Sequence, residues 1–245
     1  MEANSSANPG WASNCDFISQ RAELLRRFHL FAGIPLGDCA KIGAHAQTRH
    51  FQRGATIFRE GDDVLQLIIL TSGCVKLSQF NPTGHQEVIL RLIGPGECLG
   101  EECLAKCSTH CLTAQTLELS SGLMWDANEF VAVAERFPAL RSNFSHRLEK
   151  LVSELQERFC EVSAEKVALR LSSELVRLLA QVGKESGGHV EISLSRKDLA
   201  QLIGTTPFTV SRLLCQWELQ GIVKPRREAV EILDIPALVK LSRSL

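Results

Sequence analysis

Four cysteines crowd one short segment of this chain, and their thiols are suited to holding a metal. Cys98, Cys103, Cys107 and Cys111 are separated by four, three and three residues. Deprotonated thiols bind zinc and the irons of iron–sulfur clusters. In a helix the last three would share one side, at i, i+4 and i+8. The spacing predicts a metal or redox site, with the packing of small buried thiols as the alternative.

A second set of polar residues could read nucleic acid. The guanidinium of Arg212 can donate two hydrogen bonds to the O6 and N7 atoms of guanine in the major groove. Lys224, Arg226 and Arg227 follow in a predicted hairpin and could contact DNA phosphates. A solvated turn is an equally good interpretation of that segment. The predicted DNA contacts are Thr206, Phe208, Thr209, Ser211, Arg212, Lys224, Arg226 and Arg227.

Two short helices must position these side chains. Ser195 and Asp198 have the spacing of a capping box, which predicts a helix from residue 196 to Ile203, where Gly204 ends it. Thr206 then caps a second helix whose first position is proline. The apolar residues that such a pair would bury are Leu199, Leu202, Ile203, Val210, Leu213, Leu214 and Trp217. A helix-turn-helix with an exposed polar second helix is suited to the major groove.

The segment DLAQLIGTTPFTVSRLL, followed by GIV and a short basic hairpin, resembles the winged helix-turn-helix of the cyclic-AMP receptor protein and fumarate-nitrate regulator (Crp/Fnr) superfamily. The resemblance covers roughly residues 34–238. It implies that Arg212 and Ser211 read bases and that RNA polymerase is a partner. Phe208 replaces a family glutamate, and a benzyl group cannot accept a hydrogen bond from cytosine N4 but can pack on a thymine methyl. The half-site is therefore expected to differ from the usual one.

Residues 50–123 show the pattern of a small β domain. Glycines recur mostly every seven to twelve residues between short apolar or alternating runs, such as 65–70, 74–80 and 87–93. RGATIFREGD and GHQEVILRLIGPGECLGE resemble the double-stranded β-helix (jelly-roll) sensor domain of the same superfamily. A cupin-type metalloenzyme is the alternative for such strands, but no histidine and carboxylate spacing suited to its metal occurs among them.

The expected effector loop departs from that of the cyclic-nucleotide-binding members. The resemblance aligns Gly96–Glu102 and His110–Ala114 with the segments that grip the cyclic phosphate, but the family's arginine is missing. Only Lys106 or His110 would offset Glu101 and Glu102, which disfavours cyclic AMP. The cofactor is left open between an iron–sulfur cluster, another metal and a small molecule.

A heptad-like apolar seam follows the β domain. The spacing of 4, 3, 4, 4 and 3 residues predicts a helix that pairs with a second copy of the chain, with packing on its own barrel as the alternative. Ser163 is expected to cap the next helix. The predicted dimerisation residues are Phe144, Leu148, Leu151, Leu155, Phe159 and Val162.

Composition agrees with a two-domain cytoplasmic protein. From residue 164 onward there are 12 Lys and Arg against 9 Asp and Glu, net +3, which leaves 15 against 19, net −4, for the rest. No stretch of eighteen apolar residues and no leader pattern occurs, so we expect no membrane association. With no leader pattern, the nine cysteines are expected to meet a reducing cytosol, so a disulfide scaffold is not expected.

The sequence predicts an α+β, non-enzymatic transcription regulator. The expected parts are a flexible N-terminal arm (1–21), a cyclic-nucleotide-binding-like β-roll sensor (22–136), a dimerisation helix (137–163) and a winged helix-turn-helix domain (164–245). We expect a homodimer that reads a two-fold symmetric site on double-stranded DNA and is switched by a redox, metal-cluster or small-molecule signal at the β-roll. The alternatives are a sensor module that acts by protein contact and the cupin-type enzyme.

Overall fold

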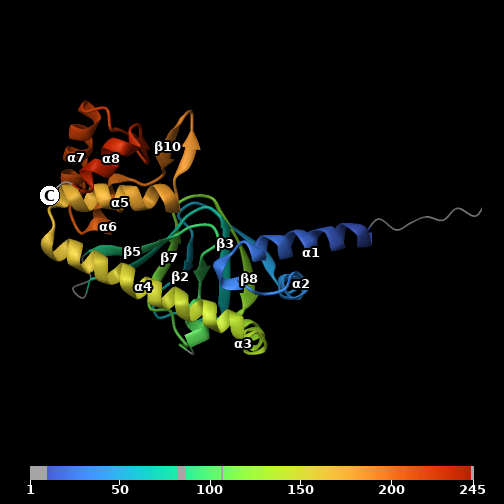
Figure 1. The fold of residues 1–245 in the computed structure, drawn as a ribbon. Helices are drawn as coiled ribbons and strands as arrows, with labels where there is room; N and C mark the ends of the chain where they lie inside the picture. Colours follow the sequence, from blue (N-terminus) through green and yellow to red (C-terminus); the bar gives the residue numbers. More distant parts are fainter. Residues whose placement is uncertain (1–9, 82–85, 106, 244–245) are drawn as a thin grey trace, which may run out of the picture.

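The computed structural model describes residues 10–81, 86–105 and 107–243. It has the predicted α+β architecture: a β-roll, a long helix beneath it, and a small helical domain with its own sheet. The long helix α4 (Pro138–Ala164) runs below the β-roll towards the C-terminal domain, and α5 (Val167–Gln181) turns back above it (Figure 1). Within the described part of the chain, no helix is both long and apolar enough to cross a membrane.

The N-terminal segment differs from the predicted flexible arm. Helix α1 (Gly10–Arg26) includes residues 10–21 of that arm, whereas residues 1–9 lie outside the described residues. Its C-terminal half packs on α2 (Leu36–Ala44), with Ala22 and Leu25 fully buried, and η1 (His29–Phe31) connects the two helices. Arg21 donates to the carbonyl of Ala46 at 2.6 Å, which ties α1 to the start of the β-roll. The polar composition of the first residues of the chain gave no sign of this helix.

Two four-stranded antiparallel sheets form the predicted β-roll. One has the order β1-β8-β3-β6 and the other β2-β7-β4-β5. A short 3-10 helix, η2 (Glu101–Ala105), follows β6. The strands are β1 (Gln47–Phe51), β2 (Thr56–Phe58), β3 (Gln66–Ser72), β4 (Val75–Phe80), β5 (Glu87–Ile93), β6 (Cys98–Leu99), β7 (Thr113–Thr116) and β8 (Ser120–Asp126).

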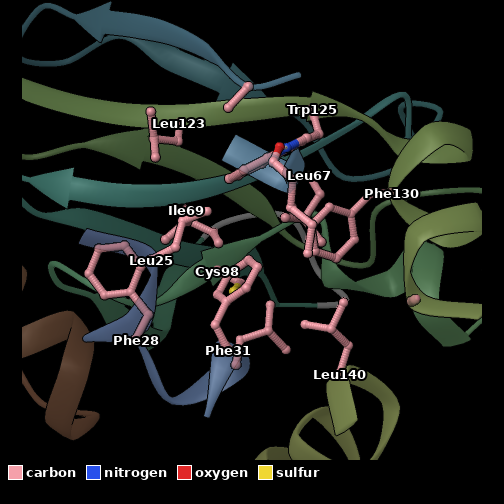
Figure 2. Close-up of a cluster of buried hydrophobic side chains, with 14 of the residues drawn as sticks. Leu25, Phe28, Phe31, Leu67, Ile69, Cys98, Leu123, Trp125, Phe130 and Leu140 are labelled. Carbon is pink, nitrogen blue, oxygen red and sulfur yellow. The ribbon is translucent and has the colours of Figure 1, made fainter. Parts of the chain in front are cut away.

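An aromatic cluster joins the roll to its flanking helices. Trp125 lies 5.5 Å from Phe130 of α3 (Ala127–Arg136) and 6.5 Å from Phe31, between ring centroids. Its indole N–H donates to the carbonyl of Ile42 at 2.9 Å, so the buried ring has its polar partner. Figure 2 shows these rings with Leu67, Leu140 and other members of the cluster. This packing fixes the start of α4 against the roll.

Helix α4 extends slightly beyond its predicted end. Ser163 lies inside it and donates to the carbonyl of Phe159, so the predicted cap at Ser163 is wrong. The next helix starts at Val167 after Lys166, which has no capping side-chain bond. A bond back to the preceding turn is the common alternative for a serine within a helix.

The C-terminal domain contains the helix-turn-helix and a small sheet. Helices α6 (Arg196–Ile203) and α7 (Pro207–Leu219) pack against each other, and α8 (Ile235–Leu241) packs on α5. The sheet has the order β11-β12-β10-β9. Its strands are β9 (Lys184–Ser186), β10 (His189–Ile192), β11 (Val223–Pro225) and β12 (Val230–Ile232).

The edge strand β5 joins the sensor to the C-terminal domain. The carbonyl of Leu90 accepts from Arg158 of α4 at 3.0 Å, and that of Leu92 accepts from Gln181 of α5 at 2.7 Å. Ile89 and Leu92 belong to the hydrophobic cluster that also contains Leu175 and other residues of α5. The two parts therefore share a core.

Candidate functional site

The helix-turn-helix forms at the predicted residues. Ser195 accepts from the backbone N–H of Asp198, whose carboxylate accepts from the Ser195 N–H, which completes the capping box. Gly204 has a φ of 66°, a left-handed conformation that ends α6 at low cost only for glycine. The hydroxyl of Thr206 accepts from the Thr209 N–H at 3.2 Å and caps α7. Local sequence therefore sets the turn between the two helices.

Helix α7 has one buried face and one exposed face. Val210, Leu213, Leu214 and Trp217 are buried against the rest of the domain. On the other side, Phe208 is 79 % exposed and Arg212 is exposed, while Thr209 and Ser211 are half-buried beside them. Arg212 makes no hydrogen bond or ion pair with any residue that the structure describes. Its guanidinium is therefore available for an external acceptor.

The predicted wing forms from β11, β12 and the turn between them. Lys224 and Arg227 are exposed cations on this hairpin. Arg226 is already engaged, because its Nε donates to the Glu231 carboxylate at 2.6 Å. Its backbone carbonyl accepts from Arg196 at 3.0 Å, which joins the wing to the start of α6.

The four-cysteine site does not assemble. Cys98 is buried in the aromatic core (Figure 2), and burial raises the pKa of its thiol to about 12. Burial raises the pKa of Cys103 to about 11, whereas Cys107 and Cys111 are exposed. The predicted helix through Cys103, Cys107 and Cys111 is only the short η2, so the i, i+4, i+8 geometry is absent. Across the described residues, no three His, Cys, Asp or Glu side chains converge as metal ligands.

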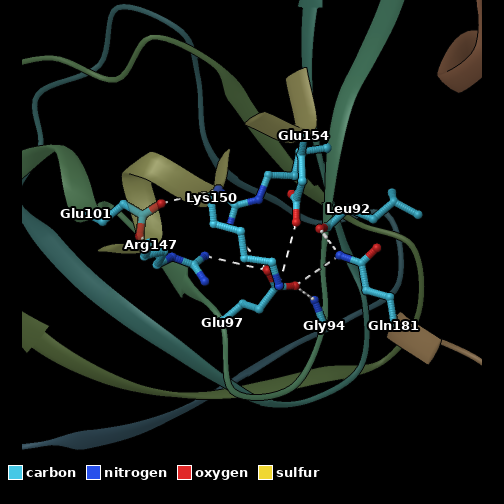
Figure 3. Close-up of polar contacts among 9 residues, drawn as sticks. Leu92, Gly94, Glu97, Glu101, Arg147, Lys150, Glu154 and Gln181 are labelled. Carbon is cyan, nitrogen blue, oxygen red and sulfur yellow. Dashed lines mark hydrogen bonds and ion pairs between the residues drawn. The ribbon is translucent and has the colours of Figure 1, made fainter. Parts of the chain in front are cut away.

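Ion pairs surround the glutamate that aligns with the family's effector loop. Glu101 accepts from Arg91 of β5 at 3.2 Å and from Arg147 of α4 at 2.8 Å. The Arg147 side chain is largely buried; burial lowers the pKa of its guanidinium, but Glu101 and the other acidic neighbours outweigh that effect and raise it. Figure 3 shows Arg147 beside both Glu101 and Glu97. Both carboxylate oxygens of Glu101 therefore have partners from within the chain.

Glu97 connects the sensor loop to both α4 and α5. It accepts from the Gly94 N–H at 2.7 Å and from Gln181 at 3.1 Å, and it lies 3.6 Å from Arg147 (Figure 3). Burial tends to raise the pKa of Glu97, but Arg91 and these partners outweigh it and lower that pKa below its ordinary value. A Cβ at Gly94 would lie 2.9 Å from the Gln181 carbonyl, so the loop meets α5 too closely for a side chain.

The other end of the aligned loop provides no anion-binding fork. His110 is buried and stacks on Phe58, with ring centroids 3.5 Å apart, at the wall of a cleft of about 560 Å³. The Thr113 hydroxyl accepts from the Glu60 N–H at 3.1 Å. Lys106, the other predicted cation, lies outside the described residues. No arginine therefore lines this cleft in the part of the chain that the structure describes.

The seam of α4 is shifted from the predicted set. Phe144 is buried in the core of its own chain, whereas Leu151 is half-buried and, like Leu155, lines a groove beside the roll. Val152, which is not in the predicted set, is 53 % exposed. The exposed stripe of α4 has spacings of 4, 3, 4 and 3 and consists of Leu148, Val152, Leu155, Phe159 and Val162. Its strict heptad rhythm was the signal that could have identified Val152.

Comparisons with known proteins agree with this architecture. Residues 48–137 match the family described as cyclic nucleotide-binding domain, and residues 169–241 match the Crp-like helix-turn-helix domain. The chain is 25% identical to the CRP-like cAMP-activated global transcriptional regulator of Mycobacterium tuberculosis, over 90% of this chain and 99% of that protein. It is 28% identical to the cyclic AMP receptor protein of Thermus thermophilus, over 88% and 97%. The structure of FixK2 from Bradyrhizobium japonicum has the same fold, with a TM-score of 0.72, 17% identity, and coverage of 82% and 98%.

Proposed function

Because this chain belongs to the Crp/Fnr superfamily of transcription regulators, we propose that it reads a two-fold symmetric DNA site as a homodimer. The exposed face of α7 carries this proposal. Arg212 is unpaired by the described residues and stands on a helix whose opposite face is buried, as a groove-reading helix requires. Duplex DNA is thus the principal partner in this proposal.

Substitution of Arg212 tests base reading. Arg212→Ala should cost about 1–3 kcal/mol at one guanine position of a selected site and leave weak non-specific binding largely intact. Arg243→Ala is the matched control, because Arg243 is an exposed arginine of the same domain outside α7. Binding is measured by fluorescence anisotropy on selected and scrambled duplexes. Equal losses on both duplexes would mean that Arg212 is only a phosphate contact.

Phe208 is proposed to set the half-site preference. It is 79 % exposed next to the start of α7, where a benzyl group can contact a thymine methyl. Phe208→Glu should shift selection towards a cytosine-containing site, since a carboxylate accepts from cytosine N4. Selection from a randomised duplex pool measures the shift, and identical sites for both proteins would refute this role.

The α4 stripe supports homodimer formation. Five large apolar side chains on one face of a helix, exposed in the single chain, fit a parallel partner in heptad register. Pairing through α4 would place two copies of α7 on one side of the dimer. The resemblance to the superfamily also supports RNA polymerase as a partner.

Cyclic AMP is not the effector that we propose. Two of the relatives have cyclic AMP in their names. In this chain, however, both carboxylate oxygens of Glu101 accept hydrogen bonds from Arg91 and Arg147. Among the described residues, no arginine lines the adjacent cleft. We propose instead a redox or small-molecule signal at the β-roll that reaches α4 and α5 through Glu97. Calorimetric titration with cyclic AMP should give no binding heat and no change in DNA affinity. Stoichiometric binding that tightens DNA binding would contradict this proposal.

A further inference from the structure

The tip of the wing lies against a basic turn of the sensor domain. Arg53 and Glu228 form an ion pair at 2.7 Å, although they lie 175 positions apart in the sequence. Glu228 lies in the wing turn, where the Arg226 N–H donates to the Ala229 carbonyl at 2.8 Å. Arg53 lies in the turn between β1 and β2. A cation of the β-roll therefore lies against the wing turn that also carries Arg226 and Arg227.

The turn that carries Arg53 is firmly held. The Gly54 N–H donates to the Thr116 carbonyl at 2.9 Å, and the Thr116 hydroxyl donates to the Gln52 carbonyl at 2.6 Å. Gln115 donates to the Gly54 carbonyl at 3.0 Å. The backbone on both sides of Arg53 is thus bonded to β7, while its side chain stays 61% exposed. Such a turn presents a guanidinium at a fixed place beside the wing.

The ion pair itself is easily exchanged. Its carboxylate partner is 50% exposed, and surface pairs of this kind contribute little to stability. A DNA phosphate near the wing would offer Arg53 a competing acceptor that can take two parallel hydrogen bonds. Glu228, by contrast, would be repelled by the same phosphate.

We propose that Arg53 of the β-roll binds the DNA backbone beyond the half-site read by α7, and that Glu228 holds it in place in the free protein. This inference rests on the proposed DNA reading by the winged helix-turn-helix. It makes the sensor domain part of the DNA interface. The footprint then extends outside the two half-sites, on both sides of a two-fold symmetric complex.

Two duplexes test this proposal with the full-length protein. The short duplex ends at the selected half-sites, and the long one adds roughly one helical turn on each side. The parent should bind the long duplex more tightly. Arg53→Ala should remove that advantage and reduce the slope of log affinity against log salt by about two per dimer on the long duplex only. Glu228→Gln should strengthen binding to the long duplex.

Lys41→Ala is the control, because Lys41 is also an exposed, ion-paired cation of the sensor domain. It should leave both affinities unchanged. Equal binding of parent and Arg53→Ala to the long duplex would overturn the proposal. So would tighter binding of Arg53→Ala to both duplexes, since the pair would then restrain the wing. Failure of the parent to select the short duplex would instead refute the reading role of α7.

Discussion

Truncation of Phe159 should weaken the dimer strongly. This side chain is 73% exposed in the single chain and is the fourth of the five residues of the α4 stripe. Full burial of a phenylalanine contributes about 1.5–3 kcal/mol. Burial of the exposed 73% then contributes about 1–2 kcal/mol per side chain, and a two-fold dimer buries it twice. Phe159→Ala should therefore cost about 2–4 kcal/mol, which raises the dimer dissociation constant roughly 30- to 700-fold.

Sedimentation velocity over a concentration series, without DNA, measures this dissociation constant. Phe208→Ala is a matched control, because Phe208 is a phenylalanine of similar exposure, at 79%, on a helix outside the stripe. Its dimer constant should equal that of the parent. A Phe159→Ala protein whose dimer constant stays within twofold of the parent would show that the stripe is not the dimer surface. Leu155→Glu should then also leave the dimer intact, instead of producing monomers.

Three further outcomes follow from the described contacts. Ser195→Ala should lower the free energy of unfolding by about 1 kcal/mol in urea denaturation, because it removes the cap of α6, and a loss below a few tenths would refute the capping role. The pKa of Glu97 is lower in the folded protein than in the unfolded chain, so its ionised form stabilises the fold above the unfolded-state pKa, and this stability is lost as pH falls through the folded-state pKa. The melting temperature should therefore drop below about pH 4.5, and the drop should be smaller in Glu97→Gln. Alkylation of the folded protein, read by mass spectrometry, should label the exposed thiols and spare the buried ones; rapid labelling of Cys98 would contradict its place in the core. The expected labelled set is Cys107, Cys111, Cys160 and Cys215, and the spared set is Cys39, Cys74, Cys98 and Cys103.

Features with a local cause could be predicted from sequence. The capping box at Ser195, the left-handed Gly204 and the Thr206 cap lie within a few residues of their partners, so their pattern sets the helix boundaries. Four strands of the roll, β2 to β5, followed from turn spacing for the same reason. The prediction that Val210 and Trp217 are buried and that Phe208 and Arg212 point outward also agrees with the structure, because helical periodicity separates the two sides of α7.

Features that depend on distant segments of the chain could not be predicted from sequence. The pairing of Arg147 with Glu101 joins residues 46 apart, and no local pattern selects Arg147 among the arginines of α4. Crowding of cysteines suggested a metal site, but burial of Cys98 depends on the aromatic core that α1, η1 and α3 complete around it. Phe144 fitted the heptad seam equally well from sequence, and only the fold shows that its own core buries it.

The side chains of α4 and α5 that cover the exposed edge of β5 determine how a fragment of this protein would behave. A fragment that ends after α3 would keep every strand of the roll, but it would lose Arg158 and Gln181, which cover the Leu90 and Leu92 carbonyls. It would also expose Ile89 and Leu92 beside those unpaired backbone groups. An apolar, unprotected strand edge is a template for strands of other molecules. The isolated β-roll should therefore tend to self-associate, although each of its own hydrogen-bonded ladders is complete.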